Sequence, residues 1–270
     1  MIRDITIGQY IDVDSPVHRI DPRVKILGVL MFIIILFTAG SFFEYAVITL
    51  FLAAVIKLTN IKLRFMLKGL KPMLFILLFT AVINILLTPG EIIAEINLYL
   101  FTLRITAEGL KMGLLMIVRI IYLVIGTSVL TLTTSPLMLT DGIEKLLSPL
   151  EIIRIPAHEI AMMMTIAIRF IPTLAEEADK IMKAQTARGA DFESGNILKR
   201  AKAMIPLLVP LFVSAFRRAD DLAVAMDSRC YGSGMKRTRM KIMKLGRYDV
   251  WAGVILALLC SILIIIKIAI

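Results

Sequence analysis

Long apolar segments constrain this chain more than any other feature, because they are too extended to be hidden inside one soluble core. The stretch from Ile26 to Leu58 is interrupted only by Gly40-Ser41 and the charged residues Glu44 and Lys57. Further apolar segments cover residues 67–87, 107–132 and 250–266. Helices of about 17–25 apolar residues are long enough to cross a bilayer. The sequence therefore predicts an all-α, polytopic membrane protein.

The first apolar segment predicts two crossings joined by a tight hairpin. Its 33 residues would reach about 50 Å as one helix, which is short for two crossings of a ~30 Å hydrocarbon layer. We therefore expect the basic residues near its ends to extend toward water. A single re-entrant hairpin is the alternative. Counting two crossings here, the chain has about five spans.

The basic residues are segregated along the chain. Of 31 Lys and Arg, 27 lie in residues 1–25, 57–71 and 132–249. Positive charge gathers on the cytoplasmic side of membrane spans, so this pattern predicts a cytoplasmic N-terminus and an external C-terminus in a lipid bilayer. Topology explains the net charge of +10 better than nucleic-acid binding does, because the basic residues alternate with the spans.

Residues 133–249 are too charged to cross lipid, yet they contain the apolar stretches Ile160–Phe170 and Met204–Phe216. Both are shorter than a span. We expect them to belong to long cytoplasmic helices at the membrane surface, bent at Pro172, Pro206 and Pro210. The turn between them is predicted at 191–196. This divides the chain into an N-terminal membrane region (1–132), a cytoplasmic helical region (133–249) and a last span (250–270).

The cytoplasmic region contains an internal repeat with an offset of 41 residues. Both copies read Ala-Asp-x-aliphatic-x-x-Ala-x-x-small-Arg-small, and they end in Ala187-Arg188-Gly189 and Ser228-Arg229-Cys230. An arginine between small residues at a helix end is accessible, and its rigid fork of donors suits carbonyls and carboxylates of a partner. Two such ends suggest a dimeric or pseudo-dimeric partner. The alternative is that both arginines only favour the negative end of a helix dipole.

A resemblance to a known family covers essentially the whole chain. The sequence is similar to the transmembrane (T) components of energy-coupling factor (ECF) transporters, a group that includes subunits of cobalt and biotin importers. The motifs that carry it are Thr133-Thr134-Ser135-Pro136, Ile155-Pro156-Ala157-His158-Glu159, Arg169-Phe170-Ile171-Pro172, Glu176-Glu177-Ala178 and Ala184-Gln185-x-x-Arg188-Gly189-Ala190-Asp191-Phe192.

The resemblance implies a non-catalytic subunit in the cytoplasmic membrane of a prokaryotic cell. The two cytoplasmic helices would be coupling helices, each ending in an Ala-Arg-Gly-like motif that inserts its arginine into one of two ATP-binding cassette ATPase subunits. ATP and magnesium would be bound by those subunits, so no cofactor is expected in this chain. A membrane-embedded substrate-binding (S) component would supply the vitamin or metal ion.

One of the two motifs departs from the family pattern. Ala187-Arg188-Gly189 matches it in full, whereas Ser228-Arg229-Cys230 keeps only the arginine. Cys230 is the larger change, because it adds a side chain where glycine leaves the backbone open. The resemblance therefore carries the docking geometry over to the first motif in full, but to the second only through its arginine.

The sequence gives little support for a metal site, for ATP binding or for a stand-alone transporter. His158-Glu159 begins an HExxH-like pattern, but Met162 stands at the second ligand position, so no metal site is predicted. No phosphate-binding P-loop motif occurs. Arg119 lies within a span, where charge is costly; it is either functional or bonded to Asn84 or to carbonyls of neighbouring helices. A stand-alone secondary transporter or channel, the alternative function, would use such intramembrane polar residues.

Overall fold

The computed structural model describes residues 10–98, 101–153, 156–192, 196–232 and 245–269. These residues belong to two compact units. One unit, here called the membrane unit, comprises Gly8–Pro149 and Met243–Ile270. The other, here called the α7–α8 unit, contains Leu150–Ile242. Residues 133–149, which the sequence assigned to the cytoplasmic region, thus group with the membrane unit.

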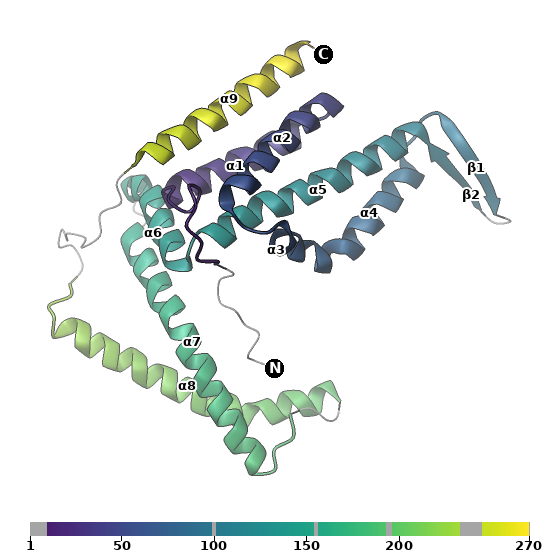
Figure 1. Ribbon diagram of the computed structural model, residues 1–270. Helices are drawn as coiled ribbons and strands as arrows, with labels where there is room; N and C mark the ends of the chain where they lie inside the picture. The colour runs from purple at the N-terminus through teal and green to yellow at the C-terminus, as the bar shows by residue number, and fades with distance from the viewer. Residues whose placement is uncertain (1–9, 99–100, 154–155, 193–195, 233–244, 270) are drawn as a thin grey trace. The chain divides into compact units, whose positions relative to one another are not determined.

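Helices dominate both units (Figure 1). The membrane unit contains α1 (Pro22–Thr38), α2 (Phe42–Thr59), α3 (Leu63–Leu67), the 3-10 helix η2 (Lys68–Met73), α4 (Leu74–Leu87), β1 (Ile92–Leu98), β2 (Phe101–Thr106), α5 (Ala107–Thr133), α6 (Pro136–Leu147) and α9 (Arg247–Ala269). The α7–α8 unit contains α7 (Ala157–Ala187) and α8 (Ile197–Asp227). The short 3-10 helix η3 (Ser148–Ile153) lies at the division between them.

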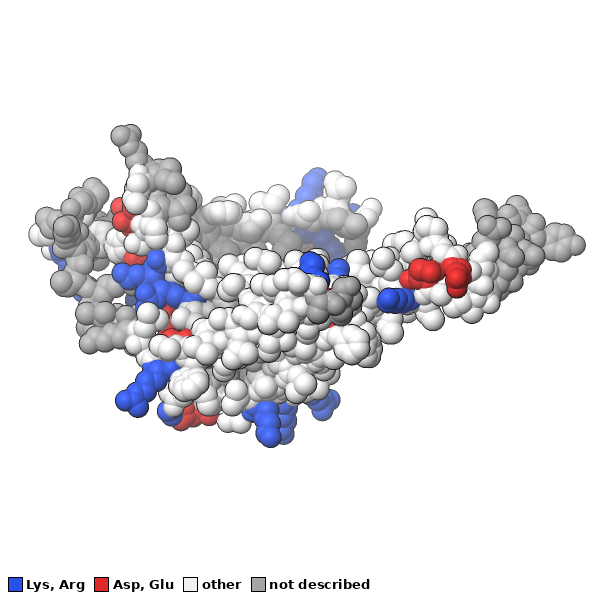
Figure 2. Space-filling view, turned by 90° about the horizontal axis from the view of Figure 1, so that it is seen from above, with Lys and Arg blue, Asp and Glu red and all other residues white. Residues whose placement is uncertain are grey.

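The predicted membrane character is confirmed. Within the described residues, 4 helical segments are long and apolar enough to cross a bilayer: Phe42–Thr59, Leu63–Leu87, Ala107–Thr133 and Arg247–Ile268. The remaining predicted span, α1, has 17 residues, the lower limit for a crossing. Much of the apolar surface faces outward, as in Phe75 and Leu87 of α4. Figure 2 shows one face on which a broad area carries no charged side chain.

The predicted hairpin between the first two helices is present. Helix α1 ends at Thr38 and α2 begins at Phe42. Ser41 starts α2 with a capping box, since its side chain accepts from the Glu44 N–H while the Glu44 carboxylate accepts from Ser41 N–H at 2.9 Å and from Gly40 N–H at 2.6 Å. The acidic residue that interrupts the apolar stretch therefore satisfies backbone donors that lipid would leave unpaired.

The third span and the external loop of the membrane unit differ from the prediction. The third span begins as α3 and η2 rather than as one α-helix, and Pro72 lies inside η2; a proline cannot donate the hydrogen bond that a regular helix requires. The expected external loop is an antiparallel hairpin, in which Ile96 pairs with Leu103 and Leu98 with Phe101. The β-branched residues of this segment, such as Ile92 and Ile93, favour extended structure.

Glycines bring α5 close to its neighbours. Gly109 and Gly113 lie one helical turn apart on the side of α5 that meets α4. A Cβ atom at Gly109 would come within 2.8 Å of the Ile85 carbonyl oxygen, and one at Gly113 within 3.3 Å of the Ala81 carbonyl oxygen. Small residues at this spacing allow helices to pack closely in membranes. Helices α1, α2, α5 and α9 also lie side by side (Figure 1).

A buried polar junction joins the starts of α1 and α9. Asp21 caps α1, accepts two hydrogen bonds from the Arg23 guanidinium and donates its own N–H to the Asp249 carboxylate at 2.6 Å. The Lys25 ammonium donates to the Thr133 carbonyl at the end of α5, at 2.9 Å. Hydrogen bonds from Arg23, opposed by partial burial, hold the pKa of Asp21 below its ordinary value. This junction fixes three helix ends at one edge of the membrane unit.

We expect Asp21→Asn to destabilise the protein at neutral pH. Asparagine still caps the helix, but the charge that pairs with Arg23 is lost, at a cost of about 1–3 kcal/mol. Because the folded pKa of Asp21 is depressed, its contribution is present above the ordinary aspartate pKa and is lost as pH falls through the folded value. Thermal unfolding in detergent should therefore separate wild type from variant at pH ~7. The difference should shrink below pH ~4 and vanish once the pH has fallen below the folded pKa of Asp21.

The matched control is Asp14→Asn. Asp14 also pairs with an arginine, Arg19, but its side chain is 75% exposed. Exposed pairs contribute little to stability, so this variant should unfold like wild type. Equal destabilisation by the two variants would contradict the importance of the buried junction.

Candidate functional site

The α7–α8 unit consists mainly of two long helices that cross each other (Figure 1). Each has 31 residues, so the predicted short apolar stretches are indeed parts of longer helices. Pro172 lies inside α7, and Pro206 and Pro210 lie inside α8. Asp191, Phe192 and Asn196 lie between the two helices, as predicted for the turn, whereas residues 193–195 fall outside the described residues.

The two arginine motifs lie at the C-terminal ends of these helices and share one backbone geometry. At the end of α7, Gly189 N–H donates to Thr186 O at 2.9 Å and Ala190 N–H to Gln185 O at 3.0 Å. At the end of α8, Cys230 N–H donates to Asp227 O and Tyr231 N–H to Met226 O, both at 2.9 Å. The second pair is the first shifted by 41 residues. The sequence repeat is therefore also a repeat of hydrogen bonds.

The small residue after each arginine adopts a left-handed conformation. Gly189 has a φ of 88° and Cys230 a φ of 54°. This is the conformation in which helices commonly end, and glycine adopts it without strain. Cys230 reproduces the turn of Gly189 despite its side chain, so the departure of Ser228-Arg229-Cys230 from the family pattern does not change the shape of the helix end.

Arg188 and Arg229 are both exposed. Neither guanidinium makes an ion pair or a hydrogen bond with another residue in the part of the chain that the structure describes. Each therefore keeps its full set of donors available for a partner. The helix C-terminus beside each arginine carries partial negative charge, which favours the arginine there but leaves the outward donors unused.

One contact that the sequence analysis missed joins the two helices. The Arg218 guanidinium forms an ion pair with the Glu177 carboxylate at 2.5 Å. The side chains of Ser214 and then Arg218 lower the pKa of Glu177. The two partners are separated by 41 residues, the offset of the repeat, and that coincidence is the signal by which the sequence could have indicated the contact.

The intramembrane residues Arg119 and Asn84 are not brought together. Arg119 donates to the Ala39 carbonyl at 2.8 Å and to the Tyr45 hydroxyl at 3.0 Å, and it lies over the Phe37 ring. Asn84 donates to the Thr80 carbonyl one turn earlier in its own helix, at 2.8 Å. Groups of the α1–α2 hairpin therefore accept the hydrogen bonds of the Arg119 guanidinium. In the described structure, Arg119 and Asn84 have separate hydrogen-bond partners and form no joint site.

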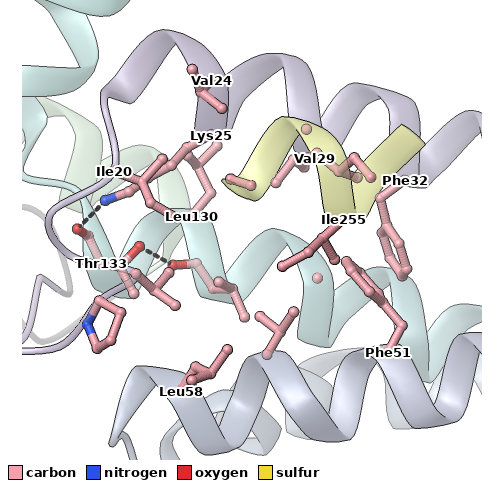
Figure 3. A pocket seen from close by; sticks show the side chains of 18 of the residues that line it. Ile20, Val24, Lys25, Val29, Phe32, Phe51, Leu58, Leu130, Thr133 and Ile255 are labelled. Carbon is pink, nitrogen blue, oxygen red and sulfur yellow. Dashed lines mark hydrogen bonds between the residues drawn. The ribbon is translucent and has the colours of Figure 1, made fainter. Parts of the chain in front are cut away.

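The membrane unit contains a half-open apolar cavity of about 230 Å³ between α1, α2, α5 and α9. In Figure 3, Lys25 reaches Thr133 at one end and Phe32 and Phe51 lie at the other. The Lys25 ammonium is engaged by the Thr133 carbonyl and by the Thr134 hydroxyl at 3.3 Å. The cavity walls thus offer apolar surface, and their charged group is already hydrogen-bonded.

His158 lies in the first turn of α7. Its ring lies 3.5 Å from the Tyr231 hydroxyl. Among the described residues, no group of three or more His, Cys, Asp and Glu side chains is arranged to hold a metal ion. Arg188 and Arg229 differ from the other exposed cations by their place at two helix ends of the same backbone geometry.

Comparison with known proteins shows the family to which the chain is similar. Residues 14–242 match the family described as CbiQ, cobalt transport protein. The chain is 54% identical to the energy-coupling factor transporter transmembrane protein EcfT of Thermosediminibacter oceani, over 96% of each chain. It is 53% identical to EcfT of Clostridium kluyveri, over 98% of this chain and 96% of that one. For EcfT of Bacillus subtilis the identity is 47%, over 94% and 92% respectively.

Near-full-length identity of this order, together with four candidate spans and two arginine-ended helices, leaves one assignment. The chain belongs to the CbiQ family and, within it, to the non-catalytic transmembrane components of energy-coupling factor transporters.

Proposed function

We propose that this chain couples two ATP-binding cassette ATPase subunits to a membrane-embedded substrate-binding S component, in an importer of vitamins or metal ions. The observation that carries the proposal is the pair of exposed arginines, Arg188 and Arg229, at helix ends of the same backbone geometry. Two equivalent ends suit two similar partners, each of which receives one arginine. The motifs Ala187-Arg188-Gly189 and Ser228-Arg229-Cys230 are the docking sites.

Each subunit of the proposed complex has a different task. The sequence has no P-loop, so ATP and magnesium are bound by the ATPase subunits. Their closure on ATP moves the two arginine-ended helices. The outward apolar side chains of α8, such as Phe212 and Phe216, transmit this movement to the S component. That component topples in the bilayer and releases its substrate on the cytoplasmic side.

The orientation follows from charge. The N-terminus and the α7–α8 unit lie on the cytoplasmic side of the cell membrane, because Lys and Arg are concentrated in residues 1–25, 57–71 and 132–249. The segments 1–132 and 250–270 form the membrane region and last span, and 133–249 forms the cytoplasmic coupling region. The lipid bilayer is the surrounding medium, and nucleic acid has no part in this function.

The double variant Arg188→Ala/Arg229→Ala is expected to lose the ATPase subunits. Two charge-assisted contacts of about 1.5–3 kcal/mol each disappear, which corresponds to at least a hundredfold weaker binding. The measurement is a pull-down from detergent with co-expressed ATPase subunits. Lys183→Ala is the matched control, because Lys183 is an exposed cation of α7 away from its end. Full retention of ATPases by the double variant would refute the docking role.

Arg119→Leu should destabilise the membrane unit rather than remove a transport site. It leaves the Ala39 carbonyl and the Tyr45 hydroxyl without their donor, at a cost of about 1–3 kcal/mol. Tyr45→Phe removes only one of these bonds and should cost less. Thermal unfolding of the purified complex ranks the variants. Normal stability with abolished transport in Arg119→Leu would instead indicate a direct role in transport.

The left-handed conformation at the two helix ends leads to a further prediction. Gly189→Ala should weaken the end of α7 by about 1 kcal/mol, because a side chain is disfavoured at positive φ. No heavy atom lies within 4 Å of a Cβ placed there, so the cost comes from the backbone alone. Cys230→Gly should be neutral or slightly stabilising. Hydrogen exchange of the amides after each helix is the measurement, and unchanged exchange in Gly189→Ala would contradict the assigned strain.

A further inference from the structure

The ion pair between α7 and α8 occupies a special position in the repeat. Glu177 and Arg218 immediately precede the repeated Ala-Asp pairs Ala178-Asp179 and Ala219-Asp220, so they are equivalent residues of the two copies. They nevertheless contact each other directly. When two copies of an element touch through the same position, the rotation that exchanges the copies passes through that contact, as in an isologous interface. The pair therefore lies on a local twofold axis.

The opposite charges of Glu177 and Arg218 suit a contact on a twofold axis. Identical charged residues on a twofold axis would face and repel each other. Here one copy carries an acid and the other a base, and the contact becomes attractive. The neighbouring positions follow the same division, with Glu176 beside Glu177 and Arg217 beside Arg218. Both neighbours are exposed, whereas the side chains of Glu177 and Arg218 are 28% and 40% exposed.

The two helices extend equally beyond the crossing. Arg188 follows Glu177 by 11 residues, and Arg229 follows Arg218 by 11 residues, so each arm is about 16 Å long. Neither arm contains proline or glycine before its arginine, whereas Pro172 and the two prolines of α8 all precede the crossing. The arms are thus continuous helix between the crossing and the tip, and the positions that interrupt backbone hydrogen bonding lie on the other side.

We propose that the Glu177–Arg218 ion pair is the fulcrum of the two coupling helices, which fixes their crossing point and hence the span between Arg188 and Arg229. This inference rests on the proposed docking function for its purpose, but not for its geometry. Glu177 and Arg218 are positioning residues. A half-exposed pair contributes little to overall stability, whereas it selects which turns of the helices meet, as charge pairs fix register at interfaces.

Because Glu177 and Arg218 are equivalent positions, single and exchanged substitutions at them should have opposite effects. Glu177→Arg places two arginines at the crossing, and the pair is replaced by repulsion. Exchanging the residues, as Glu177→Arg/Arg218→Glu, restores the attraction, because the two positions are equivalent. Glu176→Arg and Arg217→Glu are the matched controls: they make the same charge changes one residue away, on exposed side chains.

The experiment measures the distance between spin labels on the two arms by double electron–electron resonance. Labels are attached in Thr186→Cys/Asp227→Cys, at exposed and equivalent positions, with Cys230→Gly and Cys260→Ala removing the native thiols. Distances are measured on the labelled full chain in detergent, whereas substrate transported per ATP is measured in unlabelled complexes with ATPase subunits and S component, in which Thr186, Asp227 and Cys230 are unchanged. We expect one narrow distance distribution in wild type, Glu176→Arg and the exchanged pair, and a broad one in Glu177→Arg. Substrate transported per ATP should fall about fivefold in Glu177→Arg and recover in the exchanged pair.

Two results would overturn the fulcrum. One is a narrow distribution with normal coupling in Glu177→Arg, and the other is an exchanged pair that behaves as badly as the single variant. Failure of the docking function has a different signature, namely loss of ATPase subunits from wild type itself. In that case the distance measurement on the chain alone still decides whether the ion pair sets the crossing, because it requires no partner.

Discussion

The cost of placing charge and unpaired backbone groups in hydrocarbon governs the membrane unit. Its helices pair their own backbone groups, and where the chain must turn, side chains complete the pairing, as Glu44 does at the start of α2. Arg119 persists inside a span because the Ala39 carbonyl and the Tyr45 hydroxyl accept its donors. At one edge of this unit, the Asp21 N–H donates to the Asp249 carboxylate and joins the start of α1 to the start of α9.

The α7–α8 unit obeys a different constraint, because the docking role proposed for it would place its functional surface at two helix ends. A helix transmits displacement along its length only where its backbone hydrogen bonds are continuous. The arms beyond the Glu177–Arg218 pair meet this condition, since prolines are confined to the preceding parts of both helices. The shared left-handed turn at Gly189 and Cys230 then presents Arg188 and Arg229 in the same way. In the proposed function, a non-catalytic subunit would thus act through the placement of two cations.

Much of this architecture could be predicted, because its determinants are local. Apolar length predicted the spans, and the interruption at Gly40-Ser41 predicted the hairpin between α1 and α2. The apolar stretches of the cytoplasmic region predicted parts of α7 and α8, although not helix α6. The hairpin β1–β2 was missed, since alternation over a few residues competes weakly with the expectation of a loop after Pro89-Gly90.

The sequence by itself determined which segments enter the membrane, which helices end in arginine and to which family the chain belongs, because apolar length and motif spacing are properties of consecutive residues. Only the tertiary structure decided the partners of Arg119, the close approach at Gly109 and the contact between Glu177 and Arg218. Each of these joins residues far apart in the chain. Such contacts depend on how helices pack and cross, which residue order along one helix does not specify.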